Sequence, residues 1–148
     1  MNKQMEFPYT RICGIRNYIP PYFSIINVNS HYLLTHQAHI TRVLRPSLTL
    51  HTLHNMKVLP NVYSKLDAEW LGLISGIEYA LENGETAIAL EHSNLELIQG
   101  LIIPGTKFHR QNITYYKQQI LTMTEKIEWL GARPIHTRQN RAINQRLY

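Results

Sequence analysis

The hydrophobic pattern of this chain changes its period once, near residue 66, and this change restricts the folds it can adopt. Before that point, short apolar runs are rich in β-branched and aromatic residues, which is typical of strands. After it, Trp70, Ile74, Ile77 and Leu81 recur on one helical face. A chain that starts with strands and continues with alternating helices and strands is expected to form an α/β domain with a mixed sheet.

The first 66 residues are expected to form three strands. A short β-like run covers Tyr9–Gly14, and two prolines end it. The second strand covers Tyr22–Val28 and resumes over Tyr32–Gln37 after a turn signal at Asn29-Ser30. The third covers Ser47–Leu59, where apolar and polar residues alternate as in a half-buried antiparallel strand.

Local end signals mark the helices that follow. Ser64 or Asp67 can cap a helix over Asp67–Asn83, and Gly84 suits the left-handed position after its end. Gly72 and Gly76 weaken this helix, so we expect them to permit close packing on a neighbour. The remaining elements are expected at Thr86–Glu91 (strand), Asn94–Ile102 and Arg110–Gly131 (helices), Arg133–His136 (strand) and Gln139–Leu147 (helix).

The length of 148 residues predicts one domain, with residues 1–8 as an N-terminal arm and 38–63 as an enlarged strand and loop region. No apolar run reaches the ~18 residues of a membrane span, and the first residues lack the apolar stretch of a secretory signal. The single cysteine, Cys13, excludes an internal disulfide. We therefore expect a cytoplasmic protein, or one in another reducing compartment.

The charge is unevenly distributed along this basic chain. Residues 67–106 contain seven acidic residues and no Lys or Arg, whereas both flanking segments are strongly basic, which gives a net charge of +5. If the two basic segments meet in space, they form a surface that attracts phosphate groups. An ordinary charged surface is the alternative interpretation.

Three local motifs, together with the order of elements, carry a resemblance. They are Asp67-Ala68-Glu69-Trp70, Leu90-Glu91-His92-Ser93-Asn94-Leu95, and His136-Thr137-Arg138-Gln139-Asn140-Arg141-Ala142-Ile143-Asn144. These motifs resemble type 1 ribonuclease H over residues 67–147. The resemblance implies an RNase H-like mixed five-stranded sheet, with three antiparallel strands followed by parallel strands and with helices on both faces.

The resemblance also implies a chemistry. The family cleaves the RNA strand of an RNA–DNA hybrid with two magnesium ions held by four carboxylates. The four matching positions are Cys13, Glu69, His92 and Asn144, although a second register places the first of them near Val28-Asn29. Only Glu69 keeps a carboxylate, and magnesium requires hard, mostly anionic oxygen ligands. We therefore predict no metal or other cofactor, with magnesium or manganese as the alternative if the protein is active. Zinc bound by the Cys and His is a further alternative.

Candidate nucleic-acid contacts gather late in the chain, where some members of the resembled family carry a basic helix. Lys and Arg there could bind phosphates, and Asn140 matches a motif position that commonly orders a loop by hydrogen bonds. The candidates are Lys107, His109, Arg110, Lys117, Arg138, Asn140, Arg141 and Arg146.

Three alternative functions are compatible with these features of the sequence. The first is a catalytically degenerate RNase H-like protein that binds RNA or an RNA–DNA hybrid by its backbone, either alone or as a subunit of a larger assembly. The second is an active metal-dependent hybrid ribonuclease with an atypical metal site. The third is a subunit that contacts proteins or copies of itself and has no nucleic-acid role. Metal-dependent cleavage distinguishes the second, and steep salt dependence of binding distinguishes the first from the third.

Overall fold

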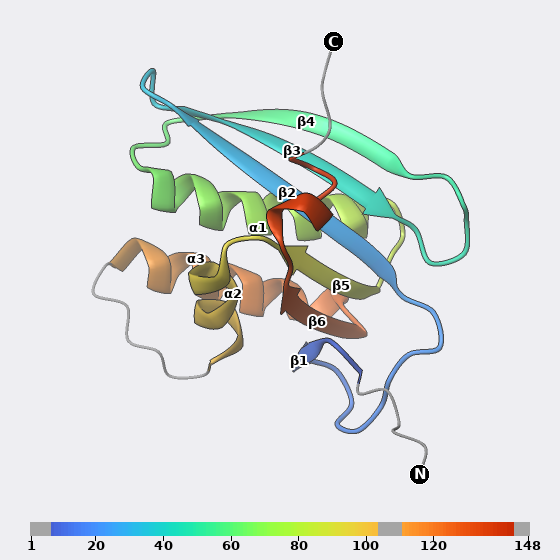
Figure 1. The fold of residues 1–148 in the computed structure, drawn as a ribbon. Coiled ribbons are helices and arrows are strands. Elements are labelled where there is room, and N and C mark those ends of the chain that lie inside the picture. Colours follow the sequence, from blue (N-terminus) through green and yellow to red (C-terminus); the bar gives the residue numbers. More distant parts are fainter. Residues whose placement is uncertain (1–6, 104–110, 144–148) are drawn as a thin grey trace.

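The computed structural model describes residues 7–103 and 111–143, with only the backbone at 111 and 112. A six-stranded sheet forms the centre of the domain, in the order β1-β6-β5-β2-β3-β4 (Figure 1). The strands are β1 (Thr10–Cys13), β2 (Ser24–Leu33), β3 (Gln37–Arg45), β4 (Leu53–Pro60), β5 (Ala87–His92) and β6 (Trp129–Pro134), and the helices are α1 (Lys65–Glu82), α2 (Leu95–Ile102) and α3 (Gln111–Met123), with 3₁₀ turns η1 (Thr124–Lys126) and η2 (Thr137–Gln139).

The sheet is mixed, as expected. Strands β2, β3 and β4 form an antiparallel meander, whereas β2, β5 and β6 run parallel to one another. The expected number of five strands is wrong, because Gln37–Arg45 forms a separate strand, β3, that the sequence did not predict. The expected first strand, β1, pairs antiparallel with the outer edge of β6. A short strand pairs there because β6 would otherwise end the sheet with unpaired backbone groups.

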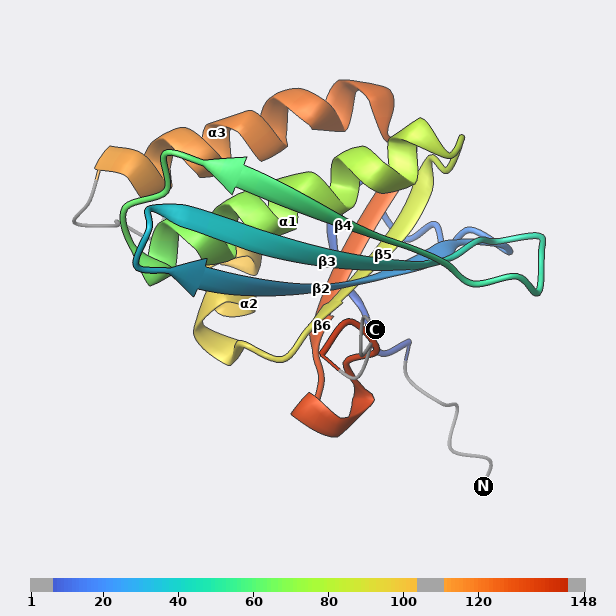
Figure 2. The same cartoon turned by 90° about the horizontal axis from the view of Figure 1, so that it is seen from above.

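The three α-helices pack on one face of the sheet. Figure 2 shows α1 and α3 side by side over this face, and all three helices contribute to one core. Ile26, Leu90 and Leu130 belong to this core from the strand side. Helices were expected on both faces. In the described part of the chain, aromatic rings cover the parallel end of the second face instead: Phe7, Tyr9 and Phe23 pack around Trp129. In that range, no helix combines the length and apolar character that crossing a bilayer requires.

The antiparallel half of the sheet differs from the expected strand boundaries. The predicted turn at Asn29-Ser30 is wrong, because both residues lie inside the continuous strand β2 and pair with β3. The chain turns at residues 34–36 instead, where Leu34 is 91% exposed and His36 has a left-handed φ of 60°. That turn contains no Gly or Pro, so its sequence carries no strong turn signal.

The last predicted helices also differ. The long helix was expected to reach Gly131, but α3 ends at Met123 and β6 begins at Trp129. Ile127 and Leu130 continue the apolar spacing of the helix by coincidence, and both are buried in the same core. The described part of the final expected helix, up to residue 143, contains the η2 turn and further turns, and residues 144–148 lie outside the described range.

The signals that position α1 are confirmed. Ser64 caps the helix by accepting a hydrogen bond of 3.0 Å from the amide of Asp67, and Gly84 has a φ of 79° after its end. A Cβ at Gly72 would lie 2.0 Å from Ser30 Oγ, and one at Gly76 would lie 2.4 Å from a methyl group of Val28. The two glycines therefore allow α1 to pack directly against β2.

Candidate functional site

The candidate site lies where the first turn of α1 meets the end of β5. Glu69 stands one turn after the Ser64 cap, and His92 is the last residue of β5. Both side chains are largely buried, with 13% of the Glu69 side chain and 4% of the His92 side chain exposed. Two of the four family positions are thus brought together.

The two side chains face one another directly. Glu69 Oε2 lies 3.4 Å from His92 Nε2, and neither atom has a hydrogen-bond partner among the described residues. His92 Nδ1 accepts a hydrogen bond of 2.9 Å from the backbone amide of Asn94. A neutral imidazole that accepts at Nδ1 carries its proton on Nε2, which is the nitrogen that points at Glu69.

Burial shifts both groups toward their neutral forms. It lowers the pKa of His92 to about 4, so the ring is neutral near pH 7. Burial also raises the pKa of Glu69, and the positive charge of Lys65, on the same turn of α1, partly opposes this. Lys65 was not singled out in the sequence, although its spacing of four residues from Glu69 is that of neighbours on a helix.

The central strand β2 contributes no carboxylate to this site. It reads Ser24 to Leu33 without an Asp or Glu. Asn27 pairs with Glu91 in the parallel ladder, so Val28 stands level with His92 and packs against α1 at Gly72 and Gly76. Val28 is one of the two residues, Val28-Asn29, near which the second sequence register placed the first family position.

Cys13 does not join this group, so the preferred register is corrected. It lies on β1 opposite Leu130, which pairs with Ile88 near the start of β5. His92 is four positions after Ile88, roughly 13 Å along the strand, and β6 lies between β1 and β5. Burial raises the pKa of the Cys13 thiol, and its side chain packs against the helix-side core.

The segment after β6 is hydrogen-bonded to the same end of the sheet through Asn140. Asn140 is fully buried. Its side-chain nitrogen donates hydrogen bonds to the Val28 carbonyl (3.0 Å) and to Ser93 Oγ (3.3 Å). Its side-chain oxygen accepts a hydrogen bond from the backbone amide of Ala142. This geometry suits the loop-ordering role, and a buried amide offers no surface for a nucleic-acid contact. Exposed Arg138 and Arg141 flank Asn140 in sequence and so lie at this end of the sheet.

The other basic candidates are placed as follows. Lys117 donates from Nζ to the carbonyls of Gly100 and Ile103, both at 3.0 Å, and so satisfies the C-terminal end of α2. These hydrogen bonds give Lys117 a structural role at the end of α2. The residues Lys107, His109, Arg110, Asn144 and Arg146 lie outside the described residues.

A buried ion network on the opposite face of the sheet was missed in the sequence. Glu91 accepts hydrogen bonds from Tyr9 (2.7 Å), Arg45 (2.9 Å), Arg133 (2.7 Å) and Asn27 (3.3 Å). Burial alone would raise its pKa, but the donors from Tyr9, Arg133 and Asn27 outweigh burial, so the pKa is lowered. Glu91 neighbours His92 in sequence, yet alternation along β5 directs it away from the site.

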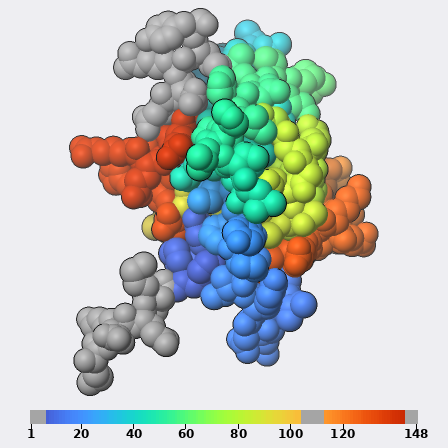
Figure 3. All heavy atoms as spheres, turned by 90° about the vertical axis from the view of Figure 1, so that its right-hand side faces the viewer, coloured from blue at the N-terminus to red at the C-terminus, as the bar shows by residue number. Residues whose placement is uncertain are grey.

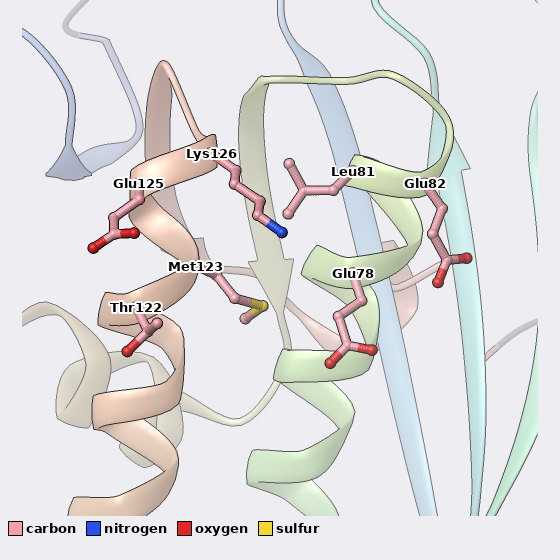
Figure 4. Close-up of a pocket in the computed structure, with 7 residues that line it drawn as sticks. All are labelled: Glu78, Leu81, Glu82, Thr122, Met123, Glu125 and Lys126. Carbon is pink, nitrogen blue, oxygen red and sulfur yellow. The ribbon is translucent and has the colours of Figure 1, made fainter.

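A groove of about 550 Å³ lies far from this site, between the C-terminal ends of α1 and α3 (Figure 4). Glu78, Glu82 and Glu125 line it beside the apolar side chains of Leu81 and Met123. Since acidic side chains repel phosphate, this groove does not suit a nucleic-acid strand.

Solved structures share this arrangement of strands and helices. The N-terminal RNase H domain of Rv2228c from Mycobacterium tuberculosis matches with a TM-score of 0.69 and 15% identity, over 83% of this chain and 91% of that chain. The chain has the ribonuclease H fold. RNase H1 from Halobacterium salinarum matches with a TM-score of 0.68 and 12% identity, also over 83% of this chain and 91% of that chain. LC11-RNase H1, isolated from compost and solved in complex with an RNA/DNA hybrid, matches with a TM-score of 0.61 and 17% identity, over 82% of this chain and 91% of that chain.

The expected RNase H-like fold is therefore confirmed. At the level of sequence, no protein-family model and no curated protein matches the chain.

The residues on this ribonuclease H fold do not fit a pair of magnesium ions. Glu69 supplies one carboxylate, its neighbour His92 supplies an imidazole, and β2 supplies no anionic group. Magnesium prefers several hard oxygen ligands, and a neutral imidazole that accepts at Nδ1 carries its proton on Nε2 and has no free lone pair for a metal ion. Over residues 7–103 and 111–143, no three His, Cys, Asp or Glu side chains converge to hold a metal ion.

Proposed function

We propose that this chain is a catalytically degenerate RNase H-like protein that binds RNA or an RNA–DNA hybrid through the nucleic-acid backbone. The observation that carries the proposal is the contact of Glu69 with His92, in a place where the resembled family collects carboxylates. Each missing negative charge removes on the order of 4 kcal/mol of attraction to a cation at contact, for an effective dielectric near 20. Loss of these charges leaves a fold suited to binding without the chemistry.

Support for binding comes from the fold and from the charges around the site. A structure of the same fold, LC11-RNase H1, is in complex with an RNA/DNA hybrid. Arg138 and Arg141 are exposed at the same end of the sheet as the site, on either side of the buried Asn140, and Lys65 is exposed on the first turn of α1. Phosphate contacts from such side chains give affinity without base specificity, which is how the shape of a duplex is recognised. A role as a subunit of a larger assembly is part of the same proposal.

One gel experiment tests the proposal. The protein is incubated with a labelled RNA–DNA hybrid and magnesium or manganese, and the products are run on native and denaturing gels. We expect a shifted but intact hybrid, with binding that weakens steeply as salt is added. Glu69→Gln is the matched control, since it removes the carboxylate and keeps the shape of the side chain.

The other outcomes identify the other functions. Cleavage that Glu69→Gln abolishes would show an active ribonuclease with an atypical metal site. A hybrid whose mobility on the native gel is unchanged and that is not cleaved would contradict nucleic-acid binding. The remaining function would then be that of a protein-contacting subunit.

A further inference from the structure

A second concave surface lies at the opposite end of the sheet, beside β1. It is a groove of about 450 Å³ formed by β1, the β1–β2 connection and the start of β6. Its lining includes Phe7, Tyr9, Arg11, Arg16, Tyr18 and Trp129. Trp129 pairs with Ala87 at the start of β5, whereas His92 ends that strand, so this groove is separate from the Glu69–His92 site. Figure 3 shows the β1–β2 connection, in blue, projecting from the lower side of the molecule.

The described lining of the groove has a positive charge. Two guanidinium groups, those of Arg11 and Arg16, line it, and among residues 7–103 and 111–143 no carboxylate does. Glu91 accepts a hydrogen bond from the hydroxyl of Tyr9, but the charge of Glu91 is neutralised by its ion pairs with Arg45 and Arg133. The exposed carboxylate of Glu128 approaches Thr86 rather than the groove, at 3.5 Å.

The local backbone holds both arginines in position. Arg11 donates from Nη1 to the Gly14 carbonyl at 2.9 Å, which folds its side chain toward the turn. Asn17 adopts a left-handed φ of 62°, and the amide of Tyr18 donates to the Ile15 carbonyl at 3.2 Å. This tight turn carries Arg16 and Tyr18 to the same groove. Asn is among the few residues that adopt this conformation readily.

Aromatic rings supply the second half of the recognition surface. Phe7 packs against Tyr9 and Trp129 with ring centres 5.4 and 5.7 Å apart, which makes a rigid floor. Tyr18 is 39% exposed and lines the groove, so its ring can receive a flat partner. Bases stack on such rings, and guanidinium groups bind phosphate oxygens in pairs.

We propose that this groove binds a nucleoside monophosphate group, with its base against Tyr18 and its phosphate between Arg11 and Arg16. The volume falls within the few hundred Å³ that small-molecule sites occupy. The same chemistry is presented by a free nucleotide and by the phosphorylated terminal nucleotide of a strand. The site is independent of the binding proposed for the Glu69–His92 end.

Titration calorimetry on the full chain tests this, with AMP, adenosine and inorganic phosphate as probes. AMP is expected to bind more tightly than either part alone, because each part offers only the stacking or only the ionic contact. Binding is also expected to change tryptophan fluorescence, because Trp129 lines the groove, whereas the other tryptophan, Trp70, lies on α1 and is not part of the lining.

Variants locate the site. Arg16→Ala and Tyr18→Ala are each expected to weaken AMP binding about tenfold, the scale of one charge-assisted hydrogen bond or one stacked base. Tyr22→Ala, an exposed tyrosine outside the lining, and Lys57→Ala, an exposed lysine on β4, are the matched controls and should leave it unchanged. Both Arg16 and Tyr18 are exposed, so the variants are expected to fold.

A short single strand, with and without a 5′-phosphate, distinguishes the two sources. Tighter binding of the phosphorylated strand than of AMP assigns the groove to strand ends, and the reverse order assigns it to free nucleotides. AMP binding that is absent, or that persists in both variants, overturns the proposal. Hybrid binding measured on the same preparations shows whether the two proposals fail separately.

Discussion

Glu69 Oε2 and His92 Nε2 lie 3.4 Å apart, and neither atom has a hydrogen-bond partner among the described residues. The pair connects the first turn of α1 to the end of β5, deep enough that burial favours the neutral form of both groups. A carboxyl group and a neutral imidazole can lie this close without charge repulsion. Two carboxylates in the same place would repel and would need a cation between them.

The first prediction follows from that contrast. His92→Asp places a second carboxylate beside Glu69, and two charges at this distance repel by about 4 kcal/mol at an effective dielectric near 20. A divalent cation relieves the repulsion, so we expect the variant to gain thermal stability when magnesium replaces EDTA, while the parent protein does not. Thermal melts in both buffers measure the effect.

The control for this experiment removes the partner charge. The double variant Glu69→Gln, His92→Asp keeps the shape but has one carboxylate, and its response to magnesium should fall back toward that of the parent. A parent protein that is stabilised by magnesium as strongly as the variant would contradict the interpretation of the site.

The second prediction concerns pH. The unfolded chain protonates His92 near pH 6.5, whereas the folded chain does so only at about 4, so the contribution of His92 to stability declines as the pH falls across this window. The raised pKa of Glu69 acts in the opposite direction. His92→Gln removes the first effect, and its urea midpoint should therefore fall less on acidification than that of the parent. Equal falls in the two proteins would show that His92 is not buried in its neutral form.

The contrast between Gly72 and Gly76 gives the third prediction. Ala favours a helix over Gly by about 1 kcal/mol, but a Cβ at Gly76 would meet the fully buried and β-branched Val28 at 2.4 Å. We expect Gly76→Ala to lower stability by about 1–3 kcal/mol, the scale of overpacking. At Gly72 the close atom is the hydroxyl of Ser30, which can rotate away, so Gly72→Ala should cost less. Urea unfolding of the two variants ranks them, and the opposite order would contradict this packing.

Much of the fold could be predicted because its signals are local. The first helix was expected over Asp67–Asn83 and is found over Lys65–Glu82, since Ser64 and Gly84 mark its ends within a few residues. The β2–β3 hairpin was divided wrongly because Asn29-Ser30 resembles a turn, while its place in mid-strand depends on pairing with β3. Periodicity could not separate α3 from β6, because both bury apolar side chains in one core.

The site, like the fold, could be predicted only where its signals are local. Glu69 and His92 were identified from short motifs, and the fold brings them together. The first family position could not be fixed, because it depends on which strand pairs with β5, and that pairing joins residues about sixty positions apart in sequence. The donors of Glu91 come from three different strands and the segment before β1, so no local pattern could reveal them.

The fourth prediction tests that network. Glu91 is buried, while Arg45 and Arg133 are about one third exposed, so water screens part of each ion pair. Glu91→Gln leaves two arginines without their shared carboxylate and should lower stability by about 1–3 kcal/mol, below the range for fully buried pairs. Arg45→Ala should cost less, since Arg133 still neutralises the carboxylate. Urea unfolding measures both, and equal losses would show that the two arginines do not share the charge.

The fifth prediction concerns the salt dependence of hybrid binding. If Arg138 and Arg141 each neutralise a phosphate, the double variant Arg138→Ala, Arg141→Ala should bind more weakly on any sequence, and the slope of log affinity against log salt should become shallower by about 2. Lys57→Ala, on the exposed edge strand β4, should leave the slope unchanged. Anisotropy titrations over a salt series measure the slopes. A double variant that keeps the parent slope would place the phosphates on another surface, because a contact that neutralises no phosphate releases no counterion.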